Sequence, residues 1–333
     1  MKLKSLTFLL VALGLLNIDV SGQSKSSSEL LFEPHGKPII LVFSNLHSSF
    51  NREGNNQGFE IPRAYLGYEH DFSESFSAKV IMDVCDPGTG GLQMTAFVKN
   101  AFLMYRNNGL SVRIGMIGVD QFNVQEKHWG YRYIYKSFQD EYRFGSSADL
   151  GAGIEYSPAK FISVDVSLLN GEGYKRIQSD STLKTTFGLT VKPAEGVVLR
   201  GYYDIMKKDH TQSTIAFFAG YTYEALRLGM EYNNQRNNKM LENNDFSGIS
   251  VWASLRFAEK FSVFTRYDKL ESEPTGDEMS PWNYEKDGER FLAGLDYSPV
   301  NGVKIAPIWS GWSPSDKTQS FTSTIGLHFE IKY

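Results

Sequence analysis

The chain has 333 residues, of which 41% are hydrophobic and 22% charged, and its formal net charge is −4. A weakly acidic chain creates no strong field toward nucleic acid, and no segment after residue 22 approaches the roughly 18 consecutive apolar residues of a spanning helix. The mean hydropathy of −0.32 resembles that of a soluble protein. It also suits a membrane β-barrel, because half of each of its strands faces water.

The N-terminus has the pattern of a secretory signal peptide. Lys2 and Lys4 precede an apolar stretch from Leu6 to Leu16, and small residues end the segment at Gly22. This pattern predicts cleavage after residue 22, and the apolar stretch is too short to span a membrane. A buried core helix is the alternative, but the segment lacks a cap. We therefore predict three parts: a signal peptide (1–22), a periplasmic N-terminal segment (23–36) and a transmembrane β-barrel (37–333).

From Lys37 onward, predicted strands come in pairs joined by short turns, and longer polar loops separate the pairs. The predicted turns are 73–75, 107–109, 157–160, 193–196, 224–225, 258–260 and 298–302. The predicted loops are 51–57, 86–92, 119–146, 170–181, 206–212, 233–245, 271–288 and 311–318. Short turns on one side and long loops on the other are typical of outer-membrane barrels. The listing predicts an all-β, antiparallel up-and-down barrel of about sixteen strands, or fourteen or eighteen if one hairpin is misassigned.

Residue alternation within the strands indicates which side chains face inward. In Val197 to Ile205, Leu199, Tyr203 and Ile205 alternate with Arg200 and Asp204. A charged side chain facing lipid at mid-depth costs about 2 to 4 kcal/mol for Arg or Lys, so the charged face must look inward. Residues 38–50 and 95–105 alternate poorly, and no faces are assigned there.

The inward face of the predicted strands carries charges of both signs, which indicates a wet lumen. Structural ion pairs that hold the wall together are the alternative role for any one of these residues. The predicted pore-lining residues of the strands are Arg63, Lys79, Asp83, Arg113, Arg200, Arg227, Arg256 and Arg266.

The longest connection, 119–146, is rich in aromatic and charged residues. A loop with so much apolar surface must pack against something, and the inner wall of the barrel is available. We predict that it folds inward as a constriction, where Glu126, Lys127, Arg132 and Lys136 set the field that passing ions meet. A lid packed on the outer rim is the alternative.

No constellation for catalysis, metal binding or cofactor binding stands out. Cys85 is the only cysteine, so no internal disulfide forms, and no metal ligands or nucleophilic partners surround it in sequence. His128 lies near Glu126 and Asp140, but the spacing fits no metal motif. A barrel-embedded lipase or protease would need a poised nucleophile with a His partner, and the sequence gives no specific sign of one.

Four stretches resemble the phosphate-selective porin O/P family of Gram-negative porins. They are Ile61 to Glu69, Phe76 to Val80, Val112 to Gly115 and Ser147 to Gly151. The resemblance implies a sixteen-stranded, usually trimeric channel whose third loop folds inside. Phosphate-selecting members carry rows of lumen-facing arginines and a lysine cluster, whereas here acidic residues intersperse with the inward basic ones. The sequence therefore supports a porin without supporting phosphate selectivity.

These patterns predict an outer-membrane porin through which ions and small hydrophilic solutes diffuse passively. Its partners would be outer-membrane lipid, the solutes and, from the resemblance, two further copies in a homotrimer, with no nucleic acid and no cofactor. One alternative is a non-conducting structural or receptor barrel that docks surface partners. Another is a secreted soluble β-protein that binds carbohydrate. The sequence specifies neither the solute nor the ion preference.

Overall fold

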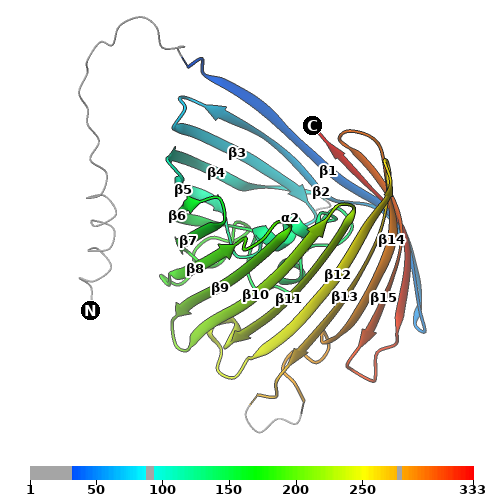
Figure 1. Cartoon of the computed structure of the whole chain (residues 1–333). Coiled ribbons are helices and arrows are strands. Elements are labelled where there is room, and N and C mark those ends of the chain that lie inside the picture. Colours follow the sequence, from blue (N-terminus) through cyan, green and yellow to red (C-terminus); the bar gives the residue numbers. More distant parts are fainter. Residues whose placement is uncertain (1–31, 88–93, 276–279) are drawn as a thin grey trace, which may run out of the picture. The chain divides into compact units, whose positions relative to one another are not determined.

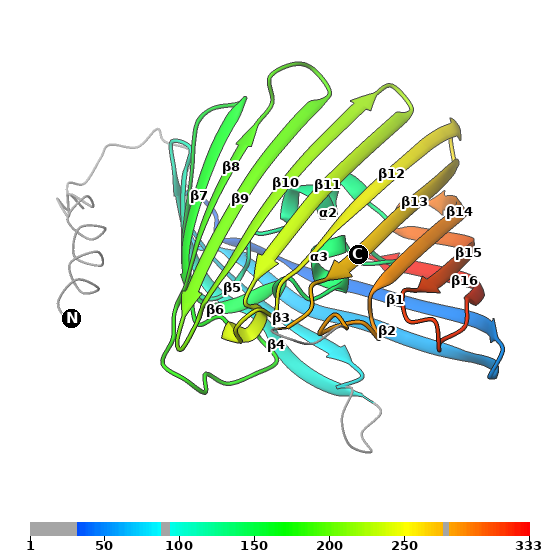
Figure 2. The ribbon, with the colours of Figure 1, turned by 90° about the horizontal axis from the view of Figure 1, so that it is seen from below.

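The computed structural model describes residues 32–87, 94–275 and 280–333. The predicted signal peptide, 1–22, lies outside the described residues. Within them, sixteen strands form one antiparallel sheet, and pairing of the first strand with the last closes it into a barrel (Figures 1 and 2). Among the described residues, no helix is long and apolar enough to cross a membrane.

Each strand pairs with its neighbours in chain order, so the barrel is an up-and-down meander. The strands are β1 (His35–Asn51), β2 (Gly54–Asp71), β3 (Phe76–Cys85), β4 (Thr95–Asn107), β5 (Leu110–Gly118), β6 (Ala148–Ala159), β7 (Ile162–Leu169), β8 (Lys184–Val191), β9 (Val197–Lys207), β10 (Thr211–Tyr223), β11 (Leu226–Arg236), β12 (Phe246–Ala258), β13 (Phe261–Ser272), β14 (Gly288–Val300), β15 (Val303–Pro314) and β16 (Thr322–Lys332).

The predicted alternation of faces is confirmed along most of the wall. In β9, Arg200 and Asp204 are buried inside the barrel, while Leu199, Tyr203 and Ile205 are exposed outside. The outer surface is therefore an apolar band, as a lipid-facing wall requires. Stacked rings lie where the short turns join the strands, for example Phe261 on Tyr297 with ring centroids 4.8 Å apart. Interfacial ring pairs of this kind are expected at a membrane boundary.

A β-bulge explains why β4 alternates poorly. Ile81 pairs with Asn100 and Met82 with Val98, so Lys99 is an extra residue in the ladder. Because one extra residue inverts the order of faces, Val98 points outward before the bulge, and Phe102 packs inside beyond it. A period-2 pattern cannot survive such an insertion.

A second bulge interrupts the pairing of β1 with β2. The register shifts between Phe43, which pairs with Arg63, and Asn45, which pairs with Glu60. Ile61 and Pro62 of β2 both lie opposite Ser44, so β2 carries one extra residue. Proline suits a bulge because it has no N–H to offer the ladder. The bulge inverts the faces of β2, as in β4, whereas β1 alternates poorly because apolar side chains such as Phe43 also occupy its inward face.

The seven predicted short turns all overlap turns of the structure, but two are shorter than predicted, because β6 extends to Ala159 and β14 to Val300. The predicted loops 86–92 and 271–288 lie partly outside the described residues, and one predicted loop is wrong. Residues 51–57 are not a loop, because β1 ends at Asn51 and β2 begins at Gly54. Asn55 pairs with Phe50 and Gln57 with Ser48, so this polar stretch stays in the ladder. Polar residues resemble a loop in sequence, yet their backbone pairs as well as that of apolar residues. The first strand begins at His35, inside the range assigned to the N-terminal segment.

Candidate functional site: the folded loop inside the barrel

The connection between β5 and β6 lies inside the ring of strands and contains two short helices, α2 (Asn123–Trp129) and α3 (Phe138–Glu141) (Figure 2). Helix α2 ends at Gly130, which adopts the left-handed conformation with φ 74° and donates its N–H to the carbonyl of Glu126. We call residues 119–147 the lumen loop. It lies inside the barrel and not on the outer rim, so the lid alternative is wrong.

Aromatic side chains hold the lumen loop against one side of the wall. Trp129, Tyr131 and Tyr133 are buried in one cluster with wall residues. The ring of Tyr131 stacks on that of Phe264 at 4.4 Å between centroids. The hydroxyl of Tyr133 donates to Asp296 Oδ1 at 2.5 Å. Since buried aromatic surface and satisfied polar groups both favour docking, the loop is part of the folded core.

A second aromatic cluster holds the later part of the loop. Phe138 and Phe144 are fully buried against Phe246 and Leu270. Phe144 stacks on Phe246 with the ring centroids 4.1 Å apart. The two clusters lie at either end of the loop segment that joins α2 to α3. Both ends of that segment are therefore fixed to the wall.

Buried arginines of the wall anchor the first residues of the loop. Arg113 forms an ion pair with Asp120 and donates to the carbonyl of Gly118 at 3.2 Å. The two terminal nitrogens of Arg200 donate to the carboxylate of Asp165 at 2.7 and 3.0 Å, and one of them also donates to the carbonyl of Asp120 at 2.9 Å. A bidentate Arg–carboxylate pair fixes geometry as well as charge. These two predicted pore-lining residues are thus anchors of the loop.

Arg132 links the loop to itself and to Tyr65 on β2. Its guanidinium donates to Glu126 at 2.8 Å, to Asp140 at 3.1 Å and to the hydroxyl of Tyr65 on β2 at 2.9 Å. Burial raises the pKa of Asp140, but the nearby Arg132 guanidinium outweighs this effect, and the net pKa is lowered. The carboxylate therefore stays ionised. The lumen loop, which leaves β5, therefore contacts β2 as well as β13 on the opposite side of the closed ring.

The ion pairs of the wall account for most of the other predicted charges. Arg63 pairs with Asp83, which is fully buried, and Lys79 pairs with Glu69 at 3.0 Å. Arg266 is held by Asp268 and donates to the carbonyl of Lys136 at 2.7 Å. The contacts of these residues match the alternative role, that of structural ion pairs that hold the wall together. Removing the partner of a buried charge would destabilise the fold.

Other predicted residues stay in contact with solvent. The side chain of Lys136 is 37% exposed and that of Lys79 is 29% exposed. Lys127 and Arg256 are exposed and do not belong to the buried ion pairs described above. Arg227 donates to the carbonyl of His128 at 3.0 Å. Solvent therefore reaches charges on both the loop and the wall.

His128 lies against the wall as a neutral side chain. The indole N–H of Trp252 donates to its Nδ1 at 3.3 Å, and its ring meets Phe218 edge-on at 5.3 Å. Burial, followed by the charge of Arg227, lowers the pKa of His128 to about 4. A neutral imidazole can accept the Trp252 bond, whereas a protonated one has no lone pair for it.

Sequence reasoning missed the wall residues that receive the loop. Phe218, Trp252 and Phe264 stand at inward positions, where a wet lumen calls for polar side chains. That mismatch was a usable signal: large rings on the polar face of a barrel strand need a packing partner inside. Tyr65, whose hydroxyl accepts a hydrogen bond from Arg132, is another large aromatic residue on the inner face of the wall.

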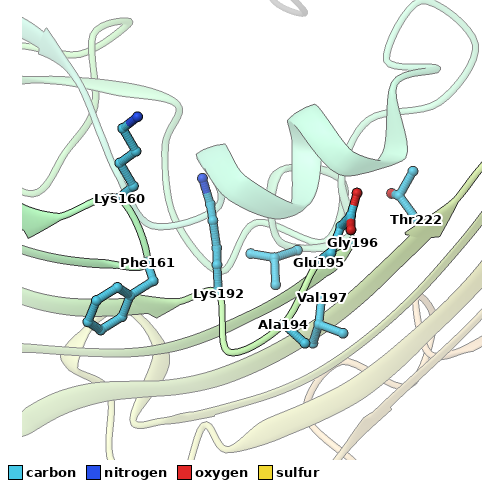
Figure 3. Close-up of a pocket in the computed structure, with 9 residues that line it drawn as sticks. Lys160, Phe161, Lys192, Ala194, Glu195, Gly196, Val197 and Thr222 are labelled. Carbon is cyan, nitrogen blue, oxygen red and sulfur yellow. The ribbon is translucent and has the colours of Figure 1, made fainter.

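No metal centre offers another site in the part of the chain that the structure describes. No group of three His, Cys, Asp or Glu residues there could hold a metal ion. An open depression of about 490 Å³ lies at the short-turn rim (Figure 3). Lys160, Lys192, Glu195 and Thr222 lie around it, on turns and strand ends. Such a rim depression has no convergent catalytic groups.

No family model matches the sequence, and no curated protein matches it. Solved structures do resemble the fold. Salmonella typhi OmpF in complex with daunomycin aligns over 89% of this chain and 97% of its own, with a TM-score of 0.68 and 11% identity. Pseudomonas putida OprB aligns over 90% of this chain and 94% of its own, with a TM-score of 0.69 and 9% identity.

A third similar structure is the anion-selective porin from Comamonas acidovorans, which aligns over 90% of this chain and all of its own (100%), with a TM-score of 0.65 and 8% identity. At such low identities the likeness concerns the fold. The chain therefore has the sixteen-stranded barrel fold of the porins.

Proposed function

We propose that the protein is an outer-membrane porin, a water-filled channel for passive diffusion of ions and small hydrophilic solutes, with the loop 119–146 as its constriction. The observation that carries the proposal is the position of the lumen loop: it leaves β5, and Tyr131 stacks on Phe264 of β13, which lies on the opposite side of the closed ring of strands. A loop across the lumen, with solvent-exposed Lys127 and Lys136, is placed to meet any passing solute.

The apolar outer face supports a location in the outer membrane, with lipid around the wall. A homotrimer is supported by the resemblance to the phosphate-selective porin O/P family, and a trimer form is named for the similar OmpT of Vibrio cholerae. Phosphate preference is not part of the proposal, since the inward arginines pair with carboxylates. The groups that would face solutes are Lys79, Lys127, Lys136 and Arg256, and no chemical step is assigned to them.

The test is the conductance of refolded protein in a planar bilayer. Deleting Trp129 to Phe138 should raise single-channel conductance, because the segment that crosses the lumen is removed. Unchanged conductance and selectivity in a deletion variant that still folds would exclude a constriction role. Replacing Lys317, an exposed lysine of the connection between β15 and β16, by Gln is the control for loss of one charge, and it should leave the conductance close to that of the parent.

One observation favours a second candidate, a non-conducting structural or receptor barrel. The loop is fixed to both sides of the wall, and its central side chains Trp129 and Phe138 are almost fully buried. A barrel filled in this way could pass no current. Absence of current in the parent, with current in the deletion variant, would identify a plugged barrel and contradict the porin proposal.

A further inference from the structure

Bare backbone forms part of the wall beneath the lumen loop. Gly220 on β10 and Gly229 on β11 lie directly opposite each other in the ladder. Gly229 in turn faces Trp252 on β12. Two adjacent inward positions without side chains leave a shallow recess between β9 and β12, and rings fill it.

The recess is occupied by wall and loop side chains together. The indole of Trp252 lies over Gly229, where a Cβ would overlap it. A Cβ on Gly220 would lie 2.7 Å from Nε2 of His128 and 2.7 Å from the ring of Phe218. Real Cβ contacts are essentially never so short, so the imidazole of the loop and the ring of Phe218 use the space that the missing side chain leaves.

A third glycine plays the same part farther along the loop. Gly248 on β12 lies beneath the ring of Phe138, and a Cβ there would overlap that ring. Phe138 is fully buried and stands at the start of α3. The loop thus meets wall glycines near the end of α2 and at the start of α3.

We propose that Gly220, Gly229 and Gly248 are positioning residues that seat the lumen loop and so set the width of the passage. The inference deepens the proposed porin function and rests on it for its consequence for solutes. The loop can approach the β10–β12 wall only as closely as these three positions allow. Since packed interiors tolerate little added volume, a side chain at any of them must move the loop or the ring above it.

The accessibility of position 137 can show whether the lumen loop is docked on the wall, and it can be measured without recording channel conductance. Ser137 precedes Phe138, is 2% exposed, and its hydroxyl lies buried without a hydrogen-bond partner. A Ser137→Cys thiol should therefore be protected from a charged, water-soluble methanethiosulfonate reagent. The parent chain, whose native Cys85 is also 2% exposed, gives the background rate of labelling.

Adding Gly220→Leu or Gly248→Leu to Ser137→Cys should make labelling roughly tenfold faster or more, because unseating exposes the thiol to solvent. Gly201→Leu is the matched control. Gly201 lies on the outer face of β9, and its nearest neighbour to an added Cβ is Phe217 at 4.0 Å. This variant should leave the thiol protected.

Folding is scored by the heat-dependent shift on a denaturing gel. If a Leu variant does not fold, Gly220→Ala and Gly248→Ala replace it, because a Cβ alone already conflicts at both positions. If the thiol stays protected in folded glycine variants, the proposal is wrong. Rapid labelling of the single variant Ser137→Cys, with all three glycines unchanged, would also overturn it. Labelling does not depend on conductance, so failure here is distinguishable from failure of the porin proposal.

Discussion

At the scale of single residues, the interior of this barrel is built from neutralised charges. Arg113, Arg200 and Arg266 are each buried with a carboxylate partner. Removing one partner of a buried pair typically costs 3–5 kcal/mol, because the other charge is left without compensation. Residues that look in sequence like guides for ions therefore contribute mainly to the stability of the wall and the loop.

His128 predicts a pH dependence of stability. Its pKa is about 4 in the fold and about 6.5 when unfolded, so between these values the unfolded chain binds a proton that the folded chain does not. The free energy of unfolding should fall as the pH drops from about 6.5 to about 4. The loss should be on the order of 1–2 kcal/mol after screening by nearby solvent.

The measurement is urea unfolding of the barrel in detergent micelles at a series of pH values, for the parent and for His128→Phe. The Phe variant lacks the titrating group. Lowering the pH from about 6.5 to about 4 should therefore reduce the free energy of unfolding of the parent by more than that of the variant. Parallel curves for the two proteins would show that His128 does not titrate as the structure implies.

At the scale of elements, turn chemistry fixes how the strands meet. Asn108 and Gly109 both have positive φ, at 46° and 81°, as a two-residue hairpin turn requires. A Cβ at Gly109 would also meet the carbonyl of Ser157 on the neighbouring strand. The position therefore demands glycine on two grounds.

Gly109→Val should accordingly destabilise the barrel by more than about 1 kcal/mol. Asn108→Gly keeps the positive φ available and should change the stability by only a few tenths of that amount. Unfolding of both variants in urea, under the same micelle conditions, provides the comparison. Equal stabilities for the two would mean that the turn does not constrain the hairpin.

Sequence reasoning located the elements better than it located the site. The turn chemistry and alternation predicted about sixteen strands and most of the inward faces, and the aromatic content of residues 119–146 predicted that this loop folds inside. Local periodicity failed where a bulge at Lys99 inverted the faces, and at polar Asn55 and Gln57, which pair as strand residues. The contacts of Arg132 with Tyr65 join positions far apart in the chain, and no local pattern records such a pairing.

At the scale of the whole molecule, closure rests on the pairing of β1 with β16, from Leu41 with Lys332 to Phe50 with Ser323. β1 and β16 each have two neighbours only if this seam forms. An unpaired strand edge inside a membrane leaves backbone groups without partners, which is costly.

A chain that ends at Gly326 should therefore fail to show the heat-dependent gel shift of a closed barrel, because Leu327 to Lys332 no longer pair with the first strand. Removal of Tyr333 alone is the milder comparison, since it removes only the bond from its N–H to the carbonyl of Ile40 and leaves the paired residues of β16 in place. A shift retained by the longer truncation would show that closure does not depend on this seam.

The seating of the lumen loop also bears on how the chain assembles. The loop follows the fifth strand in synthesis, yet the surfaces that receive it, on β10 to β13, come more than sixty residues later. Until those strands are in place, Trp129 and Phe138 lack the aromatic and apolar side chains of the wall against which they are buried. Maturation of the interior therefore has to wait for the second half of the wall, and a truncated nascent barrel would carry its aromatic loop undocked.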